Sequence, residues 1–237
     1  MRDIRSTPCT DPQAVAQLRG NRVAPARRAL CASFAATLAL LATACSLWQP
    51  APVDETVRHM LDARPAVAML ARRDLVLSVS PPRAAPGYDS TAMVYVQKPH
   101  ALDHYATHRW ADTPARMLGP LLTRTLEDTG SFRAVVQGSA AGLPADLQLD
   151  TEIVHLRQSF LAKPSRVEFT LRTQLFDVSD RRVLATRYVE VVEEASSDDA
   201  AGGVAAANAA IARALAQVAA FCVDASAGLR PRTPPAR

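Results

Sequence analysis

RVEFTLRTQLFDV, residues 166–178, alternates apolar and polar side chains along most of its length. The positions on one side are Val167, Phe169, Leu171, Thr173 and Leu175. A period of two residues is the pattern of a β-strand with one buried face and one wet face. Residues 146–160 and 182–194 predict two further long strands, and the turn-forming residues 177–181 predict a hairpin. We therefore predict an antiparallel meander whose apolar face is covered by helices.

Two segments predict these helices. The first has Asp112 or Thr113 as its N-cap, Pro114 in its first turn and Gly130 just beyond its end, and Pro120 predicts a kink inside it. The second is the Ala-rich segment 200–223, with capping candidates at 196–199.

Shorter strands complete the predicted fold. They are expected at 57–61, 75–80, 92–97 and 132–136, and a change of phase at Ile153 and Val154 predicts a β-bulge in the first strand of the meander. The predicted fold class is α/β of the α+β kind, a small, mostly antiparallel sheet with two helices packed on one face. One domain is expected to span residues 57–224.

The N-terminal part of the chain has the layout of a secretory signal peptide. Arg27 and Arg28 precede ALCASFAATLALLATA, an uncharged run over residues 29–44 that is shorter than the roughly twenty residues a membrane-spanning helix needs. A buried Ala-rich helix is the alternative, but the run shows no polar positions at a helical period. We predict that residues 1–44 are a lipoprotein-type signal peptide, with Val23 as a candidate for a later translation start.

LATAC, residues 41–45, resembles the lipobox of bacterial lipoproteins, in which the Cys receives diacylglycerol before signal peptidase II cleaves. It departs from the usual pattern because Ala42 stands where Leu, Val or Ile is preferred. An ordinary signal peptidase I site beside a chance cysteine is the alternative. We predict cleavage between Ala44 and Cys45, lipidation of Cys45 and a lipid-anchored linker over residues 45–56. By the usual sorting rule, Ser46 in place of Asp implies the outer membrane.

The net positive charge of the chain comes from the segment predicted to be removed. Residues 1–44 hold six Arg and two Asp, a surplus of four that equals the formal net charge of +4. Subtracting these from the totals of 27 basic and 23 acidic residues leaves 21 of each. A neutral mature domain lacks the basic footprint that phosphate backbones require, so we expect no nucleic-acid partner.

Cys222 is the cysteine that remains after processing, since Cys9 and Cys31 leave with the precursor segment and Cys45 is acylated. No intramolecular disulfide is therefore expected, and Cys222 is predicted to be a small buried residue on a helix. Residues 225–237, rich in Pro and Arg, predict a disordered tail.

YATHRWADTP, residues 105–114, and the following MLGPLLTRTLEDTGSFRAVV, residues 117–136, resemble the ABC-type transport auxiliary lipoprotein family. The shared features are a Tyr shortly before Arg-Trp-Ala, a Pro, a Leu-rich helix and a Gly-Phe-Val ending. The matching residues are Tyr105, Arg109, Trp110, Ala111, Pro114, Leu122, Leu126, Gly130, Phe132 and Val135. The resemblance covers roughly residues 57–222.

The resemblance implies a non-enzymatic accessory of a transporter built from an ABC ATPase, a permease and a mammalian-cell-entry-domain protein, which moves lipids between the inner and outer membranes. Docking to the mammalian-cell-entry-domain protein would use Tyr105, Arg109 and Trp110, although Trp110 could instead be a core aromatic. A ring-forming homo-oligomer is suggested by the resemblance alone. The second hypothesis is a lipoprotein chaperone for outer-membrane or lipopolysaccharide assembly, and the third is an envelope hydrolase.

Other chemistry receives little support from the sequence. His100, His104 and His108 are four residues apart, which would place them on one face of a helix, but only Asp103 or Asp112 could add a further metal ligand. We expect loop or surface histidines there, and no metal. GSAAG, residues 138–142, is not the Gly-x-Ser-x-Gly nucleophile elbow, and no P-loop pattern occurs. No catalytic residue and no cofactor are therefore expected.

Overall fold

The computed structural model describes residues 55–69, 71–138 and 144–229. The predicted signal peptide, the cleavage site at Ala44, the lipidation site Cys45 and most of the linker lie outside these ranges, as do residues 230–237 of the predicted tail. Their assignments therefore stay predictions.

The three long strands of the meander lie where the alternation predicts them. They are β7 (Leu147–Ser159), β8 (Arg166–Asp177) and β9 (Arg182–Glu194), paired antiparallel in that order. The register of β7 against β8 shifts between Ile153 and His155, which confirms the predicted bulge. Phe169 and Leu171 are at most 1% exposed, so the side of β8 predicted to be dry faces the core.

Six short strands extend the sheet to nine strands. They are β1 (Val57–His59), β2 (Val76–Val79), β3 (Arg83–Ala84), β4 (Ala92–Val96), β5 (Asp103–Trp110) and β6 (Ala134–Gln137). The pairs β1–β5, β2–β6, β2–β7, β3–β7 and β4–β7 are parallel, while β4–β5 and the meander are antiparallel. The α+β class is confirmed, and the sheet is mixed, with its longest ladders antiparallel.

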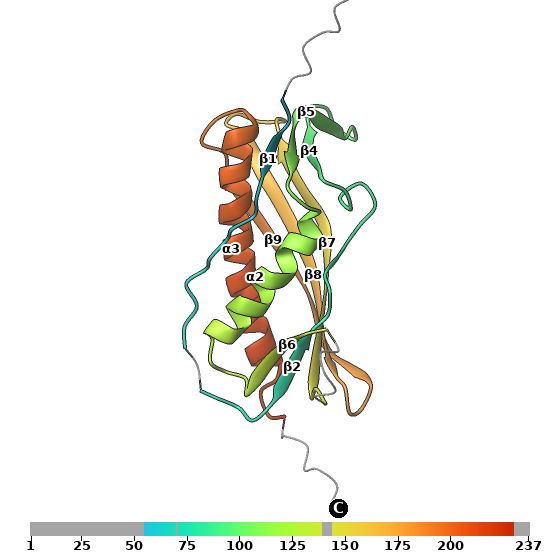
Figure 1. Cartoon of the computed structure of the whole chain (residues 1–237), viewed down its shortest axis with the longest axis vertical. Coiled ribbons are helices and arrows are strands. Elements are labelled where there is room, and N and C mark those ends of the chain that lie inside the picture. The colour runs from blue at the N-terminus through green and yellow to red at the C-terminus, as the bar shows by residue number, and fades with distance from the viewer. Residues whose placement is uncertain (1–54, 70, 139–143, 230–237) are drawn as a thin grey trace, which may run out of the picture. The chain divides into compact units, whose positions relative to one another are not determined.

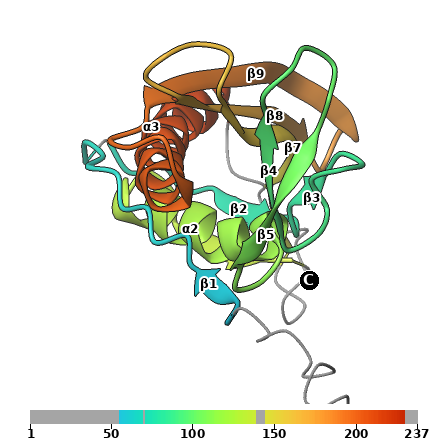
Figure 2. The same cartoon turned by 90° about the horizontal axis from the view of Figure 1, so that it is seen from above.

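Two helices lie on one side of this sheet (Figures 1 and 2). Helix α2 (Pro114–Asp128) contacts β6, β3 and β2, and helix α3 (Ala200–Ala225) contacts β9 and β8. Figure 2 shows the sheet curved so that both helices lie within its concave side. The arrangement of two helices on one face agrees with the prediction.

The helix ends follow local chemistry. Helix α2 begins at Pro114, continues without a break through the exposed Pro120, and is followed by Gly130 at a φ of +64°, a conformation that glycine adopts without strain. Asp199 caps α3 by accepting a hydrogen bond from the Gly202 amide at 2.8 Å. The start of α2, its end at Gly130 and the start of α3 all agree with the sequence-based assignment.

Helix α3 is long and apolar enough to cross a membrane by length and composition, the one such helix among the described residues. In this fold, however, 61% of its most apolar stretch is buried. Ile211, Leu215 and Cys222 are at most 1% exposed, and this burial confirms the position predicted for Cys222. Helix α3 therefore serves as the core helix of the domain.

Candidate functional site

The predicted docking residues lie on strand β5, next to the edge strand β1. No strand was predicted for residues 103–110, because most of their side chains are polar. In the structure, β5 has a partner on each side. Strand β4 pairs with β5 antiparallel, and β1 pairs with it in parallel register, matching Arg58 to Arg109 and His59 to Trp110.

The alternation of β5 separates its functional candidates onto two faces. Trp110 is 5% exposed and packs in the core, which favours its alternative assignment as a core aromatic over a docking role. Because successive side chains of a strand point to opposite faces, Arg109 faces away from the core and is exposed. Of the two neighbouring residues, only Arg109 is therefore placed to meet a partner.

Arg58 and Arg109 form a cationic pair on this outer face. They are register partners on adjacent strands, both are exposed, and neither forms an ion pair within the described ranges. Like charges at opposing positions disfavour strand pairing. Guanidinium groups bind carboxylates and phosphates through two parallel hydrogen bonds. The arginine pair is thus a surface that an acidic partner would stabilise. Arg58 was not predicted as a site residue, because nothing local in the sequence indicates that β1 lies beside β5.

On the inner side of the same two strands, His59 and His108 interact directly. His59 Nε2 lies 2.9 Å from His108 Nδ1, and the rings stack with centroids 5.2 Å apart. Partial burial, and next the proximity of His108, lower the pKa of His59. The three histidines singled out in the sequence are not gathered into one site, because His100 lies in the exposed loop after β4 and His104 is exposed on β5.

Lowering the pH from 7.5 to 5.5 is expected to destabilise the protein, in part through His59. Since the folded-state pKa of His59 lies below its unfolded value, the unfolded chain takes up a proton first, and stability falls as the pH drops through the unfolded value of about 6.5. Chemical denaturation at both pH values should show that His59→Gln weakens this pH dependence. The control His100→Gln, in the exposed loop, should leave it unchanged. An equal pH dependence in wild type and His59→Gln would contradict the assignment.

Tyr105 belongs to a hydrogen-bond network that joins β5, β7 and α3. Its hydroxyl donates to Gln158 Oε1 at 2.8 Å, and Gln158 Nε2 donates to Ser165 Oγ at 2.9 Å and to the Asp199 carbonyl at 3.2 Å. Burial, and then the nearby Asp199 and Tyr95, raise the pKa of Tyr105 to about 12. The hydroxyl therefore stays protonated and donates inside the domain, which gives Tyr105 a structural role whatever its part in docking.

The outer face of the meander carries two ion pairs. Arg157 contacts Glu168 at 2.7 Å and Arg172 contacts Glu152 at 3.4 Å. Beside them lies an open hollow of about 410 Å³. A hydroxyl–imidazole contact of 3.1 Å joins Thr170 and His155 in its floor, but Thr170 is only 6% exposed, so its hydroxyl is shielded from a substrate. The Thr170 hydroxyl is therefore not an accessible nucleophile in the hollow, which Glu168, Tyr188 and Glu190 also line.

The remaining reactive groups are also accounted for. Within residues 55–69, 71–138 and 144–229, no group of three or more His, Cys, Asp or Glu side chains is placed to hold a metal ion. Cys222 is 0% exposed, and burial raises the pKa of its thiol, so the thiol is kept in its unreactive form. The fold and its surface thus define a small α+β domain with a cationic patch at the β1–β5 edge.

Comparison with known proteins gives this domain a family. The family model of the ABC-type transport auxiliary lipoprotein component matches residues 59–219, and the chain belongs to this family. A search of curated proteins found no match.

Two solved structures share the fold. A Xanthomonas campestris protein assigned to the family model DUF330 is 23% identical, with a TM-score of 0.64, and the match covers 72% of this chain and 96% of that one. A hypothetical protein from Chlamydia trachomatis is 10% identical, with a TM-score of 0.50, and the match covers 66% of this chain and 99% of that one. At these identities the likeness shows the fold alone.

Proposed function

We propose that this protein is a lipid-anchored periplasmic accessory of an ABC transporter that moves lipids between the inner and outer membranes, with a docking role and no enzymatic one. Membership of the transport auxiliary lipoprotein family supports the class of function. The predicted lipidation at Cys45 and the Ser46 that follows it support anchoring at the outer membrane, facing the periplasm.

The observation that carries the docking role is the arginine pair, Arg58 and Arg109. Two unpaired guanidinium groups side by side cost stability in the isolated domain, and an acidic surface would turn that cost into a favourable contact. The partner we propose is the mammalian-cell-entry-domain protein of the transporter, presenting carboxylates to this pair. The ring-forming homo-oligomer remains a separate prediction.

Affinity purification tests this proposal. Tagged protein, cross-linked in intact cells and purified from membranes, should capture a mammalian-cell-entry-domain protein. Reversing both charges, Arg58→Glu with Arg109→Glu, should reduce the capture at least tenfold, because losing close charge pairs at an interface costs about 2–5 kcal/mol.

A matched control makes the same change of net charge at a different part of the surface. Arg72→Glu with Arg83→Glu alters two exposed arginines outside the β1–β5 edge and should capture as much partner as wild type. Equal capture by the Arg58 and Arg109 double variant would refute docking through the pair. Capture of a β-barrel or lipopolysaccharide-assembly protein in its place would favour the chaperone hypothesis.

A further inference from the structure

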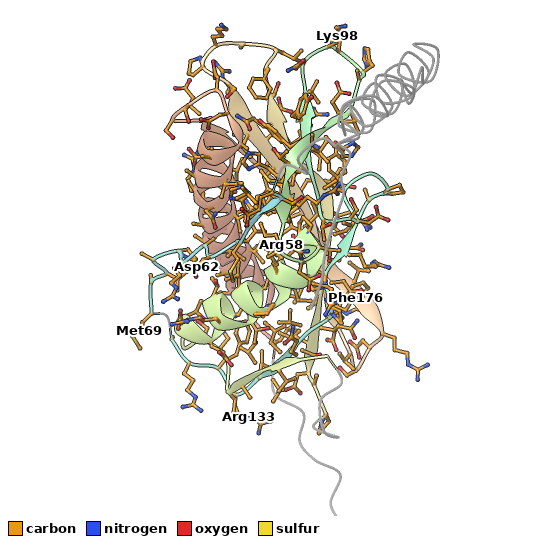
Figure 3. The ribbon with its side chains drawn as sticks, turned by 45° about the horizontal axis from the view of Figure 1, so that its top comes forward. Arg58, Asp62, Met69, Lys98, Arg133 and Phe176 are labelled. Carbon is orange, nitrogen blue, oxygen red and sulfur yellow. The ribbon has the colours of Figure 1, made fainter. Side chains whose placement is uncertain are left out.

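Two loops project side by side from one end of the sheet. Residues 97–102 connect β4 to β5, and residues 160–165 connect β7 to β8. Strands β4 and β7 run parallel, with Val96 in register with Ser159, and the Phe160 amide donates to the Val96 carbonyl at 2.8 Å. Since both strands leave the sheet in the same direction, both loops lie at the same end, which Lys98 marks in Figure 3 opposite Arg133. We call residues 97–102 and 160–165 the lysine loops.

The lysine loops share an unusual composition. Each contains a Lys-Pro pair and an exposed leucine, Lys98 with Leu102 in the first and Lys163 with Leu161 in the second. Leu102 is 44% exposed and Leu161 is 53% exposed. Lys98 and Lys163 are also the only lysines in the chain, in which every other basic residue of this class is Arg. Leucine beside lysine is the combination that suits the boundary between acyl chains and headgroups.

The anchor predicted at Cys45 connects to the domain at this same end. Because β1 runs parallel to β5, Glu55 and Thr56 enter β1 from the end of the sheet where β5 starts and residues 97–102 lie (Figure 1). Only residues 46–54 separate Cys45 from Glu55. A chain of ten residue steps spans at most about 35 Å and, when flexible, typically about 17 Å. The hairpin between β8 and β9 lies roughly 40 Å further away, the length of strand β8.

The carboxylates near the lysine loops include Asp103, Glu193, Glu194, Asp198 and Asp199. Glu194 pairs with Arg166 and Glu193 with Arg213, and the proximity of Lys163 is a minor cause of the lowered pKa of Asp198. Asp198 accepts the Ser165 amide at 2.7 Å and Asp199 accepts the Gly202 amide at 2.8 Å, contacts that direct both carboxylates to the backbone. Neither lysine takes part in an ion pair in the described part of the chain.

We propose that the lysine loops contact the surface of the bilayer that holds the lipid anchor. Leu102 and Leu161 enter the headgroup region, and Lys98 and Lys163 meet lipid phosphates. The contact orients the domain with the β8–β9 hairpin pointing away from the membrane. This inference rests on the proposed lipid anchor, and its test separates the two.

The test places a fluorophore at single cysteines of the full chain, processed by the cell. Leu102→Cys and Leu161→Cys are labelled with a nitrobenzoxadiazole (NBD) fluorophore and reconstituted into vesicles of phosphatidylethanolamine and phosphatidylglycerol. Val183→Cys, 48% exposed near the β8–β9 hairpin, is the matched control. The wild type gives the background, since Cys45 is acylated and Cys222 is buried. We expect a blue shift and quenching by spin-labelled lipid at residues 102 and 161, and neither at residue 183.

Fatty-acid labelling of Cys45 in the same preparation is read first. An acylated protein that binds vesicles can show no quenching at residues 102 and 161, or equal quenching at residue 183. Either result overturns this inference and leaves the lipid anchor supported. A protein without fatty acid overturns the anchor itself, and the inference with it. A loss of quenching on adding Lys98→Glu and Lys163→Glu supports the contact with anionic lipid.

Discussion

Cys45→Ala should abolish fatty-acid labelling of the protein and release it from the membrane fraction. Burial adds about 0.8 kcal/mol per methylene, and one acyl chain alone binds a membrane only marginally, whereas several chains on one cysteine hold a protein firmly. Without the thiol that receives diacylglycerol, the domain would keep only the proposed contact of the lysine loops with lipid. Metabolic labelling with an alkyne fatty acid, followed by separation of inner and outer membranes, measures both effects.

A second cysteine substitution controls for loss of secretion. Cys31→Ala changes an apolar position of the predicted signal peptide without removing the acceptor thiol, so labelling and outer-membrane location should match wild type. Persistent labelling of the Cys45→Ala variant would refute the assignment of the anchor. A wild-type protein that is soluble and unlabelled would remove the premise of a lipoprotein and reopen the hydrolase hypothesis.

The parts of the fold that could be predicted are those with a strong local pattern. Strand β8 alternates over most of its length and α2 has a proline at its start and a glycine just beyond its end, so both are visible without knowing their neighbours. Strand β5 has no such pattern, because its polar side chains belong to a half-exposed strand near the sheet edge. Its pairing with β4 and β1 makes it a strand, and the pairing with β1 joins segments distant in sequence.

The same limit applies to the candidate site. Arg109 was found through a family resemblance, but the resemblance could not tell that its neighbour Trp110 faces the core. Arg58 became a candidate only once the parallel register placed it beside Arg109. Arg58 and Arg109 are far apart in sequence but adjacent in the fold. A pattern within one segment can therefore indicate only one of the two residues.

Glycines inside an Ala-rich helix are a further feature that sequence alone leaves unexplained. Gly202 and Gly203 lie in the first turn of α3, where alanine would ordinarily favour the helix by about 1 kcal/mol. The structure gives the reason. A Cβ on Gly202 would overlap the Ser197 carbonyl and lie 2.6 Å from the Ser197 amide nitrogen, and a Cβ on Gly203 would overlap Gln158 Oε1 and lie 2.8 Å from its Cδ. The helix start lies against the backbone of the preceding loop at Gly202 and against the Gln158 side chain of β7 at Gly203.

Gly203→Ala is therefore expected to destabilise the domain by about 2–4 kcal/mol, against the usual gain, because it combines overpacking with loss of Gln158 hydrogen bonds. For a domain of this size that corresponds to a fall in Tm of roughly 5–15 °C, measurable by thermal unfolding. Gln158→Ala removes the obstructing side chain, so in a double-mutant cycle the added cost of Gly203→Ala should shrink to near zero in the Gln158→Ala background. A cost that is the same in both backgrounds would show that Gly203 serves some purpose other than close approach to Gln158. A reduced cost would show that the contact between Gly203 and Gln158 holds α3 against β7. Because Gln158 also accepts the hydrogen bond of the Tyr105 hydroxyl, the same contact would fix the position of that hydroxyl.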